Sequence, residues 1–141
     1  MPGTPEDSES RSPTQTIIQD AWPKIALGEY KTPAGRSSFT LCNQDANNLE
    51  IRLAKSSLKI RRESFEAAVA YLMEHDHGPG NRCVIGASNE PAKASDLCRR
   101  SRQTAKGTYG PCNIHYVLSV LKSVGVVDTD RGPPATVWLT R

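Results

Sequence analysis

The densest group of ionisable side chains in the sequence is Glu74-His-Asp-His77, and Cys83 follows shortly after it. Carboxylates, imidazoles and a thiol at such spacing are groups that bind transition metals or transfer protons. The cluster stands at the end of a predicted helix, directly before the turn sequence Gly78-Pro-Gly80, where polar side chains commonly cap the last helical turn. We therefore interpret the cluster as a helix end, with a metal or acid–base role as the alternative.

The cysteines and the hydropathy pattern indicate an intracellular setting. Cys42, Cys83, Cys98 and Cys112 are spaced too widely for the paired Cys-x-x-Cys unit of a structural zinc site. No apolar run is long enough to cross a bilayer, and the N-terminus lacks the charged and apolar regions of a signal peptide. We therefore predict a cytoplasmic protein without membrane contact, with reduced thiols and with no metal or other cofactor.

Common enzyme motifs are absent from the sequence. It contains no glycine-rich phosphate loop, no Gly-x-Ser-x-Gly, no His-Glu-x-x-His and no cysteine and histidine in the setting of a nucleophile. We therefore expect a protein without catalytic activity.

The net charge of +3 is small, but its distribution along the chain is uneven. Residues 1–20 carry one basic and four acidic side chains, whereas residues 91–141 carry eight basic and three acidic ones. The basic surplus therefore lies in the last third of the chain, which also carries the clearest structural pattern.

This last third predicts a helix, a glycine stop and a tight β-hairpin. Apolar residues recur at spacings of three and four over residues 114–124, which places them on one face of a helix. Gly125 follows, where the left-handed conformation that ends a helix is open to glycine without strain. A strand begins at residues 126–127, and the turn-forming residues 128–134 lead to a returning strand over residues 136–140.

The N-terminal part of the chain predicts a tail and one domain. Residues 1–16 contain no large apolar side chain after the initial methionine, so we expect this tail to be disordered. Residues 17–141 then form a single domain. It opens with a short helix or an extended arm over residues 17–27, which Pro23 interrupts, and continues with a loop over residues 28–35.

The middle of the chain predicts strands followed by helices. Alternating apolar and polar side chains predict a three-stranded β-meander over about residues 36–60. A helix is expected over residues 61–75, and the apolar strand Cys83-Val-Ile85 follows it. A second helix is expected to start near Asn89 or Glu90, with a proline in its first turn.

Residues 62–141 thus follow the order helix, strand, helix, helix, strand, wing, strand. The segments Leu118 to Leu121, Lys122-Ser-Val-Gly-Val-Val127 and Val137-Trp-Leu-Thr140 resemble the ending of winged-helix DNA-binding proteins. The resemblance covers about 80 residues at the level of the superfamily. The meander leading into Ile60-Arg-Arg-Glu-Ser-Phe65 also resembles DNA-reading modules of bacterial restriction enzymes. The resemblance implies an α+β fold and non-enzymatic binding of double-stranded DNA, in transcription regulation or as the recognition module of a restriction or defence system.

In the winged-helix family the third helix enters the major groove, and the wing lies against the backbone or minor groove. Carried over to this chain, the resemblance implies base contacts from the polar face of residues 112–124 and phosphate contacts from the helix and connection before it. We expect these side chains to face solvent. They are Asn113, His115, Tyr116, Ser119 and Lys122 on the third helix, Arg99, Arg100, Arg102, Lys106, Thr108 and Tyr109 before it, and Arg131 in the wing.

Other interpretations of the same residues remain open. A polar helix face and a basic helix end also occur on ordinary amphipathic helices that bind nothing.

Asp128 and Asp130 flank Arg131 and repel a phosphate backbone, so we expect the wing to contribute weakly or to insert Arg131 alone. This acidic wing favours the alternative of a winged-helix module for protein–protein interaction or homodimer formation. A nuclease subunit is a further alternative, disfavoured because no carboxylate and lysine motif is present.

Overall fold

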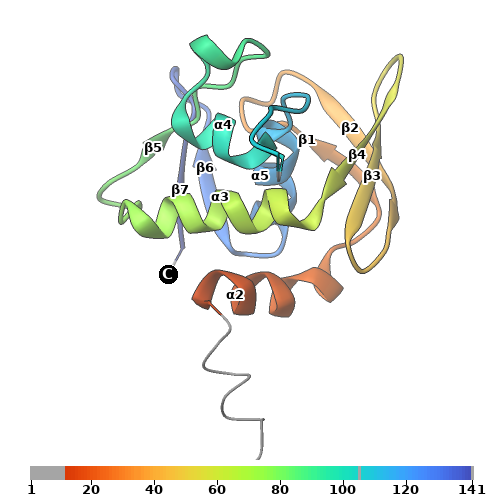
Figure 1. Ribbon diagram of the computed structural model, residues 1–141, viewed down its shortest axis with the longest axis horizontal. Helices are drawn as coiled ribbons and strands as arrows, with labels where there is room; N and C mark the ends of the chain where they lie inside the picture. Colours follow the sequence, from red (N-terminus) through yellow and green to blue (C-terminus); the bar gives the residue numbers. More distant parts are fainter. Residues whose placement is uncertain (1–11, 105, 141) are drawn as a thin grey trace, which may run out of the picture.

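The computed structural model describes residues 12–104 and 106–140, which form an α+β fold. Figure 1 shows the longest helix crossing the molecule, with the N-terminal helix below it and one antiparallel sheet on either side. None of the helices within the described residues is long and apolar enough to cross a membrane. In chain order the elements are α2 (Pro13–Ala21), the 3₁₀ turn η1 (Trp22–Lys24), β1 (Gly28–Lys31), β2 (Ser38–Gln44), β3 (Asn48–Arg52), β4 (Ser57–Arg61), α3 (Arg62–Glu74), β5 (Cys83–Val84), the 3₁₀ turn η2 (Pro91–Lys93), α4 (Asp96–Arg102), α5 (Ile114–Ser123), β6 (Val127–Asp130) and β7 (Thr136–Leu139).

Helix α2 begins earlier than expected because its first turn is capped. The Ser12 hydroxyl accepts a hydrogen bond from the backbone N–H of Gln15, and the Gln15 side chain accepts one from the N–H of Ser12, both at 3.1 Å. Pro13 occupies the first helical position, where its missing N–H costs nothing. The prediction of a disordered tail over residues 1–16 is therefore wrong from Ser12 onward, and residues 1–11 lie outside the described residues.

The N-terminal sheet has four antiparallel strands in the order β1-β2-β3-β4, not three. Strands β2, β3 and β4 are the predicted meander, whereas β1 lies in the segment 28–35 that was predicted as a loop. Tyr30 of β1 pairs with Phe39 of β2. The sequence of β1, Gly-Glu-Tyr-Lys, contains one apolar side chain, so alternation alone does not reveal it. In the core-facing rows of β2 and β3 the buried side chains are Phe39, Leu41, Leu49 and Ile51.

From α3 onward the elements follow the predicted order: α3, β5, α4, α5, β6 and β7. The last two strands form a hairpin in which Val127 pairs with Leu139. Strand β5 joins the free side of β7, with Cys83 opposite Val137, and gives the spatial order β5-β7-β6. The hairpin and the short strand after α3 therefore form one small sheet.

Helix α4 starts later than the predicted position of Asn89 or Glu90. The predicted proline lies in the separate turn η2, and the helix itself begins at Asp96. Its N-cap is Ser95, whose hydroxyl accepts a hydrogen bond from the Cys98 N–H at 3.1 Å. The capping serine, rather than the proline, therefore sets the helix start.

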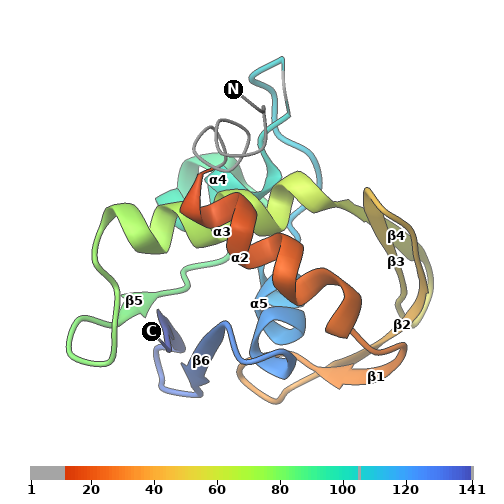
Figure 2. The ribbon, with the colours of Figure 1, turned by 90° about the horizontal axis from the view of Figure 1, so that it is seen from below.

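Helix α5 lies between the two sheets, near the centre of the fold (Figures 1 and 2). The predicted inward face, which includes Val117 and Leu118, is buried, and so is Val120 on another side of the helix. On that other side, the Tyr116 ring packs edge-on against Phe39 of β2, with ring centroids 5.0 Å apart. A helix with apolar contacts on two sides belongs to the interior of a fold. The four-stranded sheet therefore covers much of the face that the sequence predicts to be exposed.

The predicted end of α5 is confirmed. Gly125 has φ +79°, and the Val126 N–H bonds to the Leu121 carbonyl at 3.0 Å, as in a Schellman ending. A Cβ atom at position 125 would meet nothing within 4 Å, so a substitution there strains only the backbone.

Gly125→Val is therefore expected to lower the free energy of unfolding by about 1–2 kcal/mol, because a β-branched residue disfavours left-handed backbone. Urea denaturation measures this difference. Gly80→Val is the matched control, since Gly80 also has open space around it but no positive φ. Equal losses in the two variants would show that the left-handed conformation is not the cause.

Candidate nucleic-acid interface

Two of the predicted phosphate ligands are already bound by protein groups. Arg99 donates hydrogen bonds to the carbonyl oxygens of Pro91 and Ala94 at 2.9 and 2.8 Å. Arg100 forms a bidentate ion pair with Glu74, with N–O distances of 3.1 and 2.9 Å. This pairing lowers the pKa of Glu74, because the guanidinium stabilises the carboxylate. Both arginines therefore stabilise the packing around α4.

Arg102 is 3% exposed, so the expectation that it faces solvent is wrong. Its guanidinium donates to the carbonyl oxygens of Ser88 and Asn89 at 2.7 and 3.2 Å. These bonds tie α4 to the loop before η2. A guanidinium held in this way inside the fold is not available to a phosphate.

Two residues of the predicted reading face are also buried. Asn113 donates to the Ser64 hydroxyl at 3.2 Å and accepts from the Ser101 hydroxyl at 2.9 Å. The Ser119 hydroxyl donates to the Lys31 carbonyl at 2.6 Å. The expectation that Asn113 and Ser119 face solvent is therefore wrong, because α3, α4 and β1 cover them.

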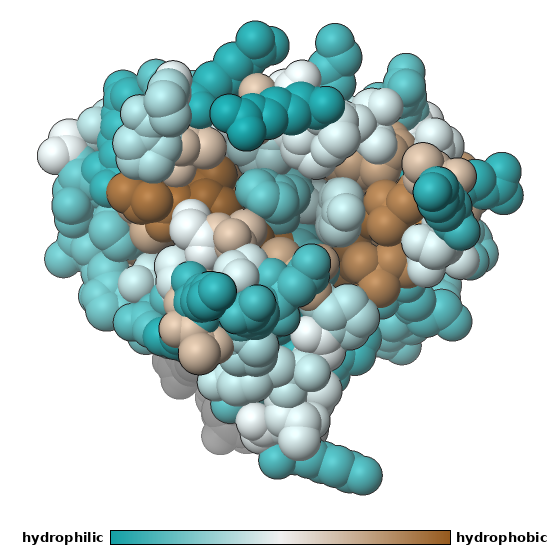
Figure 3. Space-filling model, turned by 90° about the horizontal axis from the view of Figure 1, so that it is seen from above, coloured by the Kyte–Doolittle hydropathy of each residue, from teal (hydrophilic) through white to brown (hydrophobic). Residues whose placement is uncertain are grey.

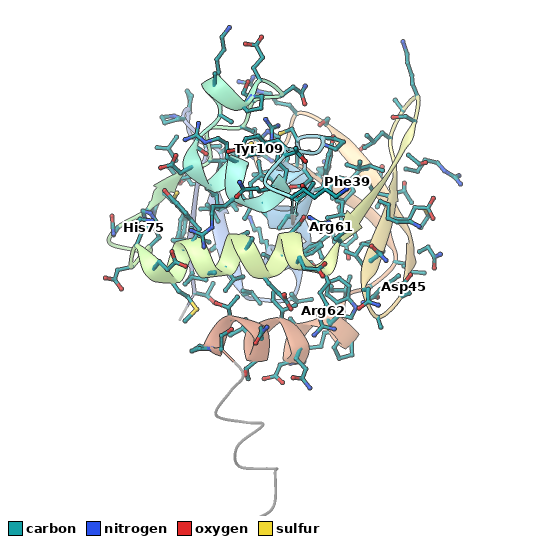
Figure 4. The ribbon with its side chains drawn as sticks, in the orientation of Figure 1. Phe39, Asp45, Arg61, Arg62, His75 and Tyr109 are labelled. Atoms are coloured by element: carbon teal, nitrogen blue, oxygen red, sulfur yellow. The ribbon has the colours of Figure 1, made fainter. Side chains whose placement is uncertain are left out.

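The other two residues of this face, His115 and Tyr116, are half-buried. Phe39, against which Tyr116 packs, is labelled in Figure 4 on the side of the four-stranded sheet that faces α5. Burial lowers the pKa of His115, so its imidazole is neutral at pH 7 and offers no charge to a phosphate. The expectation that these two side chains face solvent is therefore only partly met.

The connection between α4 and α5 keeps its predicted residues exposed. Lys106 and Thr108 are exposed, and Tyr109 is 41% exposed. A hydrogen-bonded turn holds this loop, with the Thr104 and Thr108 hydroxyls 2.7 Å apart. Figure 2 shows the loop at the edge of the molecule opposite to β6. The fold therefore separates these residues from Lys122 and Arg131.

The C-terminal end of α5 lies beside the β1–β2 loop and the wing, which is the loop between β6 and β7 (Figure 2). These three segments, together with residues of β1 and β6, line a cleft of about 430 Å³, called the wing cleft below. Its lining contains three basic side chains, five hydroxyl groups and, among the described residues, no carboxylate. The lining residues are Tyr30, Lys31, Thr32, Pro33, Gly35, Ser119, Lys122, Ser123, Thr129 and Arg131.

The two carboxylates of β6, just before the wing, are paired with cations. Asp128 lies 3.7 Å from Lys122 Nζ, and Asp130 lies 3.4 Å from the guanidinium of Arg82. Within the described parts of the chain, no carboxylate is at ion-pair distance from Arg131. The two acidic residues of β6 therefore offset charge on Lys122 and Arg82 and leave the charge of Arg131 uncompensated.

The guanidinium of Arg131 lies against the backbone of the β1–β2 loop. A Cβ atom built on Gly35 would come within 3.0 Å of Arg131 Cζ, so a glycine here makes room for the arginine. Gly35 also has φ +73°, which only glycine adopts readily. The loop and the wing therefore fit together at this glycine.

No protein-family model, curated protein or solved structure matches this chain. No relative therefore assigns a role to the wing cleft, and its chemistry is inferred from its own residues.

Sequence reasoning identified Ser119, Lys122 and Arg131 but missed the other residues of the wing cleft. Lys31 and Thr32 belong to a segment predicted as a loop, about 90 residues before the helix end that they approach. Basic and hydroxyl side chains in a loop carry no local signal of what they will face. Only the packing of β1 against α5 brings them to the wing.

The Glu74-His-Asp-His77 cluster closes the turn after α3. His77 Nδ1 lies 2.8 Å from the carbonyl oxygen of Asn81, four residues along the chain. Figure 4 shows His75 at one end of α3, far from Arg61 and Arg62 at the other. Among the residues described, no three histidine, cysteine, aspartate or glutamate side chains are arranged to hold a metal ion.

Proposed function

We propose that the protein is a non-enzymatic DNA-binding domain of the winged-helix type and that it binds duplex phosphates in the wing cleft. The order α3, β5, α4, α5, β6, β7 supports the winged-helix assignment. So does the small sheet, in which β5 pairs with the wing hairpin. We place the protein in transcription regulation or in the recognition part of a restriction or defence system.

The observation that carries this proposal is the convergence of Lys31, Lys122 and Arg131 on one cleft. Asp128 offsets part of the charge of the exposed Lys122, whereas Lys31 and Arg131 have no carboxylate at ion-pair distance among the described residues. A guanidinium can bind a phosphate through two parallel hydrogen bonds, and an ammonium group acts as a compact point charge. The Thr129 hydroxyl accepts a hydrogen bond from Lys122 Nζ at 3.1 Å, so its own proton can be donated to a phosphate oxygen, a contact of the kind found in protein–DNA complexes. The other four hydroxyl groups of the wing cleft donate to backbone carbonyl oxygens.

The proposed mode is backbone binding rather than base reading. Base contacts require side chains that reach a groove, and Asn113 and Ser119 are held inside the fold by hydrogen bonds. The cations of the wing cleft neutralise phosphate without distinguishing sequences. We therefore expect similar affinity for duplexes of different sequence.

The surface gives less support to the alternative of a protein-interaction module. In Figure 3 the apolar areas of the visible face lie apart, with polar side chains between them. Among the described residues the exposed large hydrophobic side chains are Leu27, Val84 and Tyr109, which come from three different parts of the chain. Protein interfaces usually present a contiguous apolar patch.

Fluorescence polarisation with a labelled random-sequence duplex, measured over a range of salt concentrations, tests the proposal. The variant with alanine at Lys31, Lys122 and Arg131 is expected to bind about tenfold more weakly or worse at low salt. Its plot of log affinity against log salt should flatten by about one unit for each lost phosphate contact.

A control variant with alanine at Lys24, Arg52 and Lys59 removes the same charge from exposed positions outside the wing cleft. It is expected to bind nearly as the parent does. An equal loss of duplex affinity in both variants would show that affinity depends on net charge and not on the wing cleft. A parent chain that binds no duplex at low salt would contradict DNA binding and favour the protein-interaction module.

A further inference from the structure

Two cysteine thiols that are distant in sequence touch in the fold. Cys98 lies in α4 and Cys112 lies just before α5, and their sulfur atoms are 3.7 Å apart. Cys98 is fully buried, whereas Cys112 is partly exposed. The wing cleft contains neither cysteine. The DNA-binding proposal therefore gives this contact no role.

We propose that Cys98 and Cys112 form a reversible modification site, which closes to an intramolecular disulfide by exchange with a low-molecular-weight disulfide. The partly exposed Cys112, as thiolate, attacks one sulfur of the small disulfide, and a small thiolate leaves. Cys98, as thiolate, then attacks Cys112 Sγ and expels the second small thiolate. The cysteines give up two electrons, and their two protons end on the two small thiols.

The surroundings of the pair favour ionisation. The Cys112 thiol donates to the Cys98 sulfur, and the nearby guanidinium groups of Arg102 and Arg99 add to this effect, which lowers the pKa of Cys98 to about 6. The same hydrogen bond raises the pKa of Cys112, so the proton that the two sulfurs share rests on Cys112. Either sulfur can be the donor, so the partly exposed Cys112 becomes the attacking thiolate when this proton moves across the contact to Cys98. Cys83 differs, because burial raises its pKa to about 11 and keeps its thiol protonated.

The geometry also suits ring closure. Bonded sulfurs lie about 2.0 Å apart, so the pair in contact needs only a small approach. The disulfide would join α4 to the segment just before α5, at the two ends of a connection that carries the exposed Lys106 and Tyr109. Closing a loop in the unfolded chain stabilises the folded one, so the oxidised protein is expected to melt at a higher temperature.

The test uses the full chain with Cys42→Ser, because the exposed Cys42 would otherwise react by itself. The folded protein is incubated with oxidised glutathione, its remaining thiols are alkylated, and peptides are mapped by mass spectrometry. We expect a monomer that has lost two alkylatable thiols, with Cys98 linked to Cys112. Dithiothreitol should restore both thiols. The melting temperature should rise by several degrees on oxidation and return on reduction.

Two further variants, made in the Cys42→Ser chain, assign the effect. Cys83→Ser is expected to oxidise as its parent does, whereas Cys112→Ser should retain a reduced, buried Cys98 and show no oxidation-dependent shift in melting. Circular dichroism confirms that each variant is folded. Accumulation of glutathione on Cys112 without closure, or a Cys98–Cys112 link that forms only in urea, would overturn the proposal. Peptide mapping of the Cys42→Ser chain tells these outcomes apart even if Cys112→Ser does not fold.

Discussion

Replacing Trp22 with alanine is expected to lower the free energy of unfolding by about 3–5 kcal/mol. The Trp22 side chain is 7% exposed and packs edge-on against Phe65 of α3, with ring centroids 5.4 Å apart. Its indole N–H donates to the Asp45 carbonyl at 2.9 Å, and Arg62 lies over its ring at 5.2 Å. The substitution therefore leaves a cavity between α3 and the four-stranded sheet and removes a hydrogen bond.

Chemical denaturation monitored by circular dichroism measures this effect. Leu27→Ala is the matched control, because Leu27 is 59% exposed and its truncation should change the free energy of unfolding by about 0.5 kcal/mol or less. Trp22→Phe keeps most of the apolar contact but loses the indole hydrogen bond, so we expect an intermediate loss. A Trp22→Ala variant as stable as Leu27→Ala would show that the N-terminal helical segment does not pack on the core.

Asn113→Ala is expected to cost about 2–3 kcal/mol of free energy of unfolding. The Asn113 amide bridges the buried hydroxyl groups of Ser64 and Ser101 and so joins α3 and α4 at the start of α5. Its loss leaves these groups short of partners in a place that water does not reach readily. The two hydroxyl groups can rotate toward other acceptors, which keeps the cost below that of an unpaired charge.

Lys122→Ala, near the other end of α5, is expected to affect DNA binding rather than stability. Lys122 is exposed, so its removal should change the free energy of unfolding by about 0.5 kcal/mol or less while flattening the salt dependence of duplex binding. Both variants are compared by denaturation and by fluorescence polarisation. An Asn113→Ala variant as stable as the parent but with weakened, sequence-dependent DNA binding would restore the base-reading role of α5 and contradict the buried position.

Local sequence patterns predicted the elements that depend on neighbouring residues. The three- and four-residue spacing over residues 114–124 determined the inward face of α5, and Gly125 determined its end. Alternation predicted β2, β3 and β4. The start of α2 also had a local signal, the capping pair of Ser12 and Gln15, although the polar composition around it predicted disorder.

The candidate site depended on what covers each element, which periodicity does not specify. Periodicity predicts that a polar residue opposite an apolar stripe is exposed. The Ser119 hydroxyl, however, donates a hydrogen bond to a carbonyl 88 residues away in the sequence, and the Asn113 amide donates one to a hydroxyl 49 residues away. Such distant partners leave no trace in the surrounding sequence. The sequence alone therefore identified Lys122 and Arg131 as candidate phosphate-binding residues. Only the tertiary structure placed Lys31 beside them, because β1 must pack against α5 before the three cations can line one cleft.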